Sequence, residues 1–181
     1  MHPMVKEVLI SEEQIKQRCA ELAAQIDHDY KDCEKAPLFI ALLKGSVPFL
    51  SELIKYIQMD IQFDFMDVSS YAGTQSTGEI KILKDLDCSV GGLDIVIVED
   101  IIDTGRTLKT VKELMLHRGA KSVKIVTLCD KPARRVVDIK GDYVGFEIPD
   151  EFVVGYGLDF DQLYRNLPYV GILKEEAYKG V

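Results

Sequence analysis

The sequence predicts an α/β protein whose central, mostly parallel sheet is flanked by helices. Short runs of consecutive apolar residues, typical of strands buried on both faces, recur along the chain. Segments with apolar residues at helical spacing lie between them, as expected of a parallel sheet with helical crossovers. The chain has 181 residues and no linker, repeat or low-complexity tract, so we expect a single domain over residues 1–181.

The N-terminal half alternates between helices and strands. Residues 11–28 have apolar residues at helical spacing, and Ser11 with Gln14 matches a capping box. The apolar run over residues 37–43 predicts a buried strand. The following segments predict a helix over 47–57, a strand over 60–69, a mobile polar loop over 71–78 and a returning strand over 79–83.

The C-terminal half contains the most apolar strand, residues 93–98 (LDIVIV), which Glu99 and Asp100 are expected to end. A helix is predicted over 107–117, and Gly119 suits the position just after it. We further expect strands over 123–128, 143–146 and 152–154, and a short turn of helix over 159–165.

Charge and composition exclude several classes of protein. The formal net charge is −8, whereas proteins that bind nucleic acid or anionic membranes by charge are usually basic. No apolar run reaches the roughly 18 residues of a membrane span, and residues 1–10 lack a signal-peptide core. The four cysteines show no zinc-binding spacing and are expected to be reduced thiols. We therefore expect a cytoplasmic protein that binds neither nucleic acid nor membranes.

Residues 95–107 (IVIVEDIIDTGRT) carry the residues with clear chemical potential. Glu99 and Asp100 follow a buried strand, and ligands of open α/β sheets bind at that end of the strands. Residues 103–107 then lead into a helix, whose N-terminal N–H groups suit a phosphate. Because the two acids would repel a phosphate, they either face away or hold sugar hydroxyls and a Mg²⁺ ion. A substrate with a 5′-phosphate and free ribose hydroxyls satisfies both groups.

This segment resembles the phosphoribosyl diphosphate binding loop of the type I phosphoribosyltransferases. Further motifs narrow the resemblance to the hypoxanthine (guanine) phosphoribosyltransferases and extend it over residues 38–169. They are Leu43–Lys44–Gly45 for the diphosphate, residues 69–78 for a lid, Lys131, residues 147–159 for a purine pocket, and Arg165. The resemblance implies the type I phosphoribosyltransferase fold, with a small hood subdomain and a mobile lid loop.

The same resemblance implies a reaction in which a 6-oxopurine and phosphoribosyl diphosphate give a purine mononucleotide and diphosphate. Asp103 would be the general base for purine N7, while Glu99, Asp100 and Asp159 would bind Mg²⁺. The remaining substrate-binding residues implied are Lys44, Gly45, Ser70, Tyr71 and Arg165 for diphosphate, Thr104, Gly105 and Thr107 for the 5′-phosphate, and Lys131, Phe152 and Val153 for the purine. Arg106 either adds a charge to the phosphate site or points into solvent. The family also implies a cis peptide at Lys44–Gly45.

Two of these roles have a direct physical reason. A lysine ammonium only donates hydrogen bonds, and the 6-oxo group of hypoxanthine or guanine only accepts them. Lys131 therefore disfavours adenine, whose 6-amino group would face a cation. Phe152 offers a flat aromatic face on which a base can stack.

Two other functions compete with this one. Some proteins with this fold regulate nucleic acid instead of catalysing, but the negative charge and the absence of an added DNA-binding segment disfavour a regulator. A transferase for adenine, uracil or orotate is disfavoured by Lys131 and by the segment from Phe152 to Asp159. The family commonly forms dimers or tetramers, so we expect a homo-oligomer.

Overall fold

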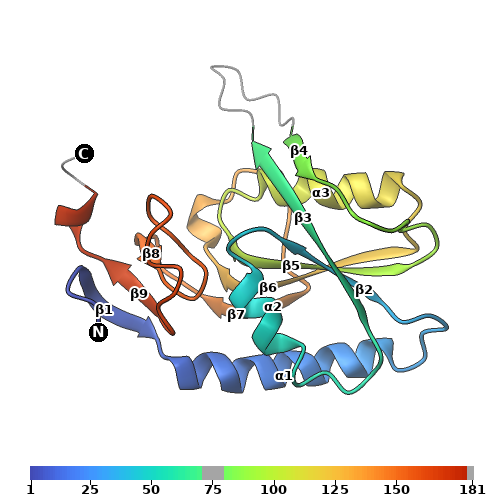
Figure 1. Cartoon of the computed structure of the whole chain (residues 1–181), viewed down its shortest axis with the longest axis horizontal. Coiled ribbons are helices and arrows are strands. Elements are labelled where there is room, and N and C mark those ends of the chain that lie inside the picture. Colours follow the sequence, from blue (N-terminus) through green and yellow to red (C-terminus); the bar gives the residue numbers. More distant parts are fainter. Residues whose placement is uncertain (71–79, 179–181) are drawn as a thin grey trace.

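The structure is a computed structural model, and it describes residues 1–70 and 80–178 (Figure 1). Its strands and helices in chain order are β1 (Val5–Ile10), α1 (Glu12–Tyr30), β2 (Leu38–Leu42), α2 (Val47–Leu53), β3 (Gln62–Ser70), β4 (Ile80–Lys84), β5 (Asp94–Ile102), α3 (Arg106–His117), β6 (Ser122–Asp130), β7 (Tyr143–Glu147), β8 (Val153–Val154) and β9 (Val170–Leu173). Short 3₁₀ turns, η1 (Pro132–Arg134) and η2 (Glu175–Ala177), follow β6 and β9.

A six-stranded sheet in the order β4-β3-β2-β5-β6-β7 forms the centre of the molecule (Figure 1). The strands β3, β2, β5, β6 and β7 run parallel, and β4 returns antiparallel to β3. All five residues of β2 are buried, as the continuous apolar run predicts. The predicted mostly parallel α/β sheet is confirmed.

Helices cover both faces of this sheet, with α1 and α2 on one side and α3 on the other (Figure 1). Alternate residues of each strand point to opposite faces. Phe39 and Ala41 of β2 accordingly pack in one hydrophobic cluster with α1 and α2, whereas Ile40 and Leu42 pack with Leu108 of α3 in a second. The two clusters fix the sheet rigidly, and its carboxyl ends carry the candidate site.

The predicted capping box starts α1. Gln14 N donates to Ser11 Oγ at 3.2 Å, and Ser11 N donates to the Gln14 side chain at 2.8 Å. The predicted position after α3 is also confirmed, because Gly119 adopts a left-handed φ of 86°. Within the described residues, no helix has the length and apolar character needed to cross a membrane.

A second, three-stranded sheet in the order β1-β9-β8 forms the predicted hood (Figure 1). Its strands pair antiparallel, and Val5 of β1 lies opposite Leu173 of β9. Neither β1 nor β9 is apparent from local sequence pattern, since the residues of β1 do not alternate regularly between buried and exposed and the two strands lie at opposite ends of the chain. This pairing brings the C-terminal segment beside the candidate site.

Three predictions of detail are wrong. Helix α2 ends at Leu53 and not at residue 57. The N–H groups of Lys55 and Tyr56 donate to the carbonyl oxygens three residues earlier, of Glu52 and Leu53, and not to those four residues earlier as in an α-helix. Residues 159–165 form turns and an isolated bridge, since Asp161, Gln162 and Tyr164 have positive φ values that a right-handed helix excludes. The cis peptide lies at Leu43–Lys44, one bond before the predicted position.

Candidate active site

Two cavities lie side by side at the carboxyl ends of β5 and β6, and they share Asp100, Ile101 and Asp103 as lining residues. The larger, which we call the base cavity, has a volume of about 450 Å³. The smaller, the phosphate cavity, has a volume of about 220 Å³. The position agrees with the rule that ligands of parallel sheets bind at this edge.

Glu99 and Asp100 lie within β5, which continues to Ile102 and not merely to residue 98 as predicted. The reason is that β6 also extends to Asp130 and keeps pairing with β5 up to Ile102. Asp100 lines both cavities, whereas Glu99 lines the phosphate cavity. The acid pair therefore stands at the boundary between the two.

The environment of this pair disfavours two negative charges. Burial raises the pKa of Glu99 well above its ordinary value, and the adjacent Asp100 carboxylate raises it further. Burial also raises the pKa of Asp100, which its hydrogen bonds to Glu99 and to the Ile101 N–H partly offset. A cation or a hydroxyl donor placed between the two cavities would relieve this repulsion.

Two close approaches require glycine beside the acid pair. A β-carbon at Gly45 would overlap the Asp100 carboxylate. A β-carbon at Gly157, whose φ is 99°, would overlap the Gly45 carbonyl oxygen and lie 2.9 Å from the Gly45 carbonyl carbon. The Lys44–Gly45 loop therefore contacts both β5 and the loop after β8.

The phosphate cavity lies at the N-terminus of α3 and is lined by Thr104, Gly105 and Thr107. Gly105 has a φ of 81°, and a β-carbon there would lie 2.5 Å from Ile139. The N–H groups and the dipole at the N-terminus of a helix suit an anion, so this cavity lies where the sequence predicts a phosphate site. Arg106 is not among the residues that line the cavity. Its carbonyl oxygen accepts a hydrogen bond from Thr110 Oγ1 at 3.1 Å, within the first turn of α3.

The base cavity gathers the predicted purine residues. Lys131, Phe152, Val153 and Asp159 line it together with Asp100 and Asp103. Lys131 is only 5% exposed, and its ammonium donates to the Glu151 carbonyl oxygen at 2.7 Å. An ammonium has three donors, so the bond to Glu151 leaves donors available for a ligand carbonyl.

Asp103 borders both cavities, and two arginines hold it. Its Oδ1 lies 3.0 Å from Arg134 Nε but is not aligned for a hydrogen bond, and this buried oxygen has no other partner in the described part of the chain. Arg135 instead donates to the backbone carbonyl oxygen of Asp103 at 3.1 Å. Asp103 thus has a fixed backbone and a carboxylate with free acceptor capacity.

Two of the predicted diphosphate residues, Lys44 and Arg165, lie close to Gln162. Lys44 Nζ and Arg165 Nη2 each lie 3.4 Å from Gln162 Oε1, and Arg165 also pairs with Asp159 at 2.8 Å. The buried Nε of Arg165 has no hydrogen-bond partner among the residues described. Two cations that share one neutral oxygen suit an anion such as a phosphate group.

The lid prediction is only partly covered by the structure. Ser70 is the last residue of β3. Tyr71 and the predicted lid over residues 71–78 lie outside the described residues.

Comparisons with known proteins identify the family of the chain. The family model of the phosphoribosyl transferase domain matches residues 7–161. The chain belongs to the phosphoribosyltransferase family. It is 56% identical over 177 residues to a hypoxanthine-guanine phosphoribosyltransferase of Bacillus subtilis (strain 168), which covers 97% of both chains. It is 58% identical over 175 residues to one of Lactococcus lactis, over 96% of this chain and 94% of that relative.

A solved structure of the family has the same fold. The crystal structure of a hypoxanthine phosphoribosyltransferase from Staphylococcus aureus matches with a TM-score of 0.94 at 55% identity, covering 98% of this chain and 96% of that one. The type I phosphoribosyltransferase fold and the resemblance drawn from the motifs are both confirmed.

Several residues of this phosphoribosyltransferase site are not apparent from the sequence. Arg134 and Arg135 contact Asp103, Gln162 joins the two diphosphate cations, and Tyr178 lines the base cavity. Adjacent arginines after a proline and an alanine give no local signal of which carbonyl they bind. Tyr178 reaches the site only because β9 pairs with β1.

Proposed function

We propose that this protein transfers the 5-phosphoribosyl group from phosphoribosyl diphosphate to hypoxanthine or guanine in purine salvage. The bond from ribose C1 to the diphosphate oxygen breaks, a bond from C1 to the purine nitrogen forms, and the products are IMP or GMP and diphosphate. The observation that carries the proposal is a buried Lys131 in one cavity with Asp103 and Phe152.

The base cavity supports the choice of a 6-oxopurine. Lys131 donates to the 6-oxo group, Phe152 provides the stacking face, and the Val153 backbone reads the edge of the base. Asp103 accepts the proton of purine N7, and a positioned carboxylate of this kind typically contributes about 10²- to 10⁴-fold in rate. Asp159 offers its backbone carbonyl to the 2-amino group of guanine.

The phosphate cavity and its surroundings support the choice of the second substrate. Thr104, Gly105 and Thr107 and the first N–H groups of α3, that of Arg106 included, bind the 5′-phosphate. Glu99 and Asp100 hold the ribose hydroxyls. Lys44, Gly45 and Arg165, with Ser70 and Tyr71 from the predicted lid, bind the diphosphate.

The acid residues fit Mg²⁺ as the cofactor. Among residues 1–70 and 80–178, no three His, Cys, Asp or Glu side chains form a metal site by themselves, so Glu99, Asp100 and Asp159 are not one protein-only site. Mg²⁺ usually binds one or two carboxylates together with substrate phosphates and water. Glu99 and Asp100 would provide such carboxylates for one ion and Asp159 for a second. When bound, the ion neutralises the leaving diphosphate.

The location and assembly of the protein belong to the same proposal. All four cysteines are free thiols, which suits the reducing cytoplasm. A homo-oligomer, dimer or tetramer, is expected from the family, and light scattering of the purified protein would measure it.

A spectrophotometric assay tests the proposed function. The protein is mixed with phosphoribosyl diphosphate and Mg²⁺, and then with hypoxanthine, guanine or adenine in separate reactions. We expect nucleotide formation with the two 6-oxopurines and little with adenine. Efficient transfer to adenine would indicate a sister transferase, and no nucleotide from any base at micromolar protein would favour a regulator.

A further inference from the structure

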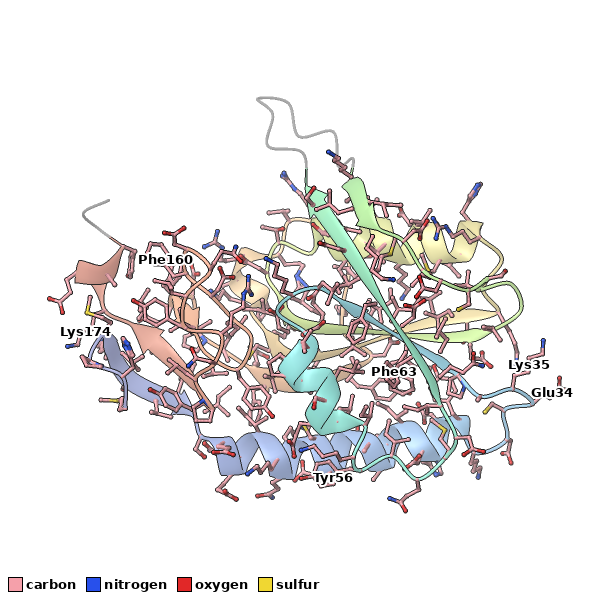
Figure 2. All side chains as sticks on the ribbon, in the orientation of Figure 1. Glu34, Lys35, Tyr56, Phe63, Phe160 and Lys174 are labelled. Carbon is pink, nitrogen blue, oxygen red and sulfur yellow. The ribbon has the colours of Figure 1, made fainter. Side chains whose placement is uncertain are left out.

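Three aromatic rings meet at the hood end of the base cavity. The rings of Phe152 and Tyr178 are stacked, with centroids 5.0 Å apart and an interplanar angle of 22°. The Phe160 ring, labelled in Figure 2 near the hood, lies 5.5 Å from Phe152 at 86° and 6.5 Å from Tyr178. Tyr178 lines the base cavity together with Phe152.

The distances show which face of Phe152 stays open. If Phe160 and Tyr178 lay on opposite faces of Phe152, their separation would approach the sum of their two distances to it. The observed distance between the Phe160 and Tyr178 centroids, 6.5 Å, is far shorter, so both rings lie on the same side of Phe152. The second face of Phe152 is therefore uncovered by these rings, and the residue remains 39% exposed.

Tyr178 is held in place by the hood. It follows η2, its N–H donates to the Glu175 carbonyl oxygen at 3.1 Å, and its side chain packs against the buried hood residues Val5, Val154 and Leu173. The Lys174 N–H anchors the same segment to the Met4 carbonyl oxygen at 2.9 Å. The hood contacts therefore hold Tyr178 on the side away from the base cavity's other lining residues.

We propose that Tyr178 is a positioning residue for the base: its ring supports Phe152 from the hood side, so that the opposite face of Phe152 is presented to the purine. This inference rests on the proposed function and adds the C-terminal segment to the purine site. An aromatic ring held on one face by another ring loses little further freedom when a base stacks on the other face.

The size of the effect follows from pre-ordering of the Phe152 ring. Without Tyr178 the purine would have to immobilise that ring itself, which costs roughly 2- to 12-fold in affinity for one side chain. Tyr178→Ala should raise the KM for hypoxanthine and guanine by that factor. The KM for phosphoribosyl diphosphate and kcat should stay within about twofold, because Tyr178 lines only the base cavity.

Matched variants separate positioning from general damage to the hood. Tyr178→Phe keeps the ring and should restore the purine KM of the unmodified protein. Tyr169→Leu removes a ring from the same hydrophobic cluster, but that ring is not among those that contact Phe152. It should leave the purine KM unchanged even if it lowers the melting temperature.

A fluorescence reporter provides a readout independent of turnover. The chain contains no tryptophan, so Tyr178→Trp introduces a single tryptophan, which can be excited selectively over the remaining tyrosines and should stack on Phe152. Titration with GMP should change its emission with a saturable dependence, whereas titration with diphosphate alone should not.

The outcomes distinguish this inference from the proposed function. If the unmodified protein fails to transfer to any purine, both are overturned. If it is active but Tyr178→Ala leaves the purine KM unchanged, or raises both KM values alike, only the role of Tyr178 is overturned. A lower purine KM in Tyr178→Ala would also overturn it, because Tyr178 would then occupy the place of the base.

Discussion

Arg135 connects the loop that carries Asp103 to the segment after Lys131, and its removal is the most informative perturbation of this fold. Its guanidinium donates to the carbonyl oxygens of Asp103 at 3.1 Å, Ile139 at 2.8 Å and Ile102 at 3.3 Å. It also forms an ion pair with Asp130. Arg135→Met keeps an unbranched apolar stem in place of the arginine methylenes and removes all four interactions.

The expected loss of stability follows from burial. The side chains of Arg135 and Asp130 are only 15% and 17% exposed, and breaking such a buried pair costs about 3–5 kcal/mol. For a protein of this size each kcal/mol shifts the melting temperature by roughly 2–4 °C, so we expect a decrease of about 6–20 °C. Because the Asp103 backbone loses its donor, kcat should fall as well, by about tenfold or more.

Urea and thermal unfolding measure the stability, and steady-state kinetics measure kcat. Arg134→Met is the matched control. Arg134 is 51% exposed and pairs with Asp103, which is 41% exposed, so its loss should change stability by less than about 1 kcal/mol. If Arg135→Met were as stable as Arg134→Met, the proposed role of the buried arginine would be refuted. If Arg135→Met is less stable, a double-mutant cycle with Asp130→Asn will measure how much of the lost free energy of unfolding belongs to the ion pair.

Three further predictions concern the site itself. Asp103→Asn should lower kcat by about 10²- to 10⁴-fold and leave the KM for phosphoribosyl diphosphate nearly unchanged, as steady-state kinetics would show; similar losses in both would argue against a general base. Lys131→Gln should relax discrimination against adenine or abolish 6-oxopurine binding, and unchanged selectivity in a competition assay would exclude it from base recognition. Glu99→Gln should inactivate the enzyme yet raise its melting temperature at neutral pH, because the raised pKa of Glu99 means that its charged form opposes folding. That gain should be full above the raised pKa of Glu99, shrink as the pH falls below it, and vanish only below the ordinary pKa of a glutamate in the unfolded chain, where both states are neutral; a gain independent of pH would contradict this account.

The parts of the fold that could be predicted from the sequence are those with a strong local signal. The continuous apolar residues of β2 and β5 predict strands in the interior of a sheet, where both faces are covered. Residues 103–107 carry their small and polar side chains in a characteristic order. The hood could not be predicted in the same way. The β1–β9 pair joins the two ends of the chain, and its register shifts leave β1 without a regular alternation of buried and exposed residues.

The loop after β8 shows where a correct local inference leads to a wrong element. Asp159 accepts a hydrogen bond from the Gln162 N–H at 2.9 Å, as a helix N-cap would. The predicted helix nevertheless does not form, because the backbone of Asp161 and Gln162 turns left-handed. The hydrogen bonds of Arg165 to the Gly157 carbonyl oxygen and of the Gly157 N–H to the Arg165 carbonyl oxygen close the loop instead. Tertiary contacts thus decide a conformation that local spacing leaves open.

Gly45 and Gly157 bring the Lys44 loop and the loop after β8 into direct backbone contact, although the two lie far apart in the sequence. With no side chain between the two backbones, any shift of the Lys44 loop is transmitted directly to the turn that carries Asp159 and Arg165. A library that randomises position 157 should therefore return glycine alone among active clones. Even a single methyl group would overlap the Gly45 carbonyl and push the Lys44 loop away from the turn that carries Asp159.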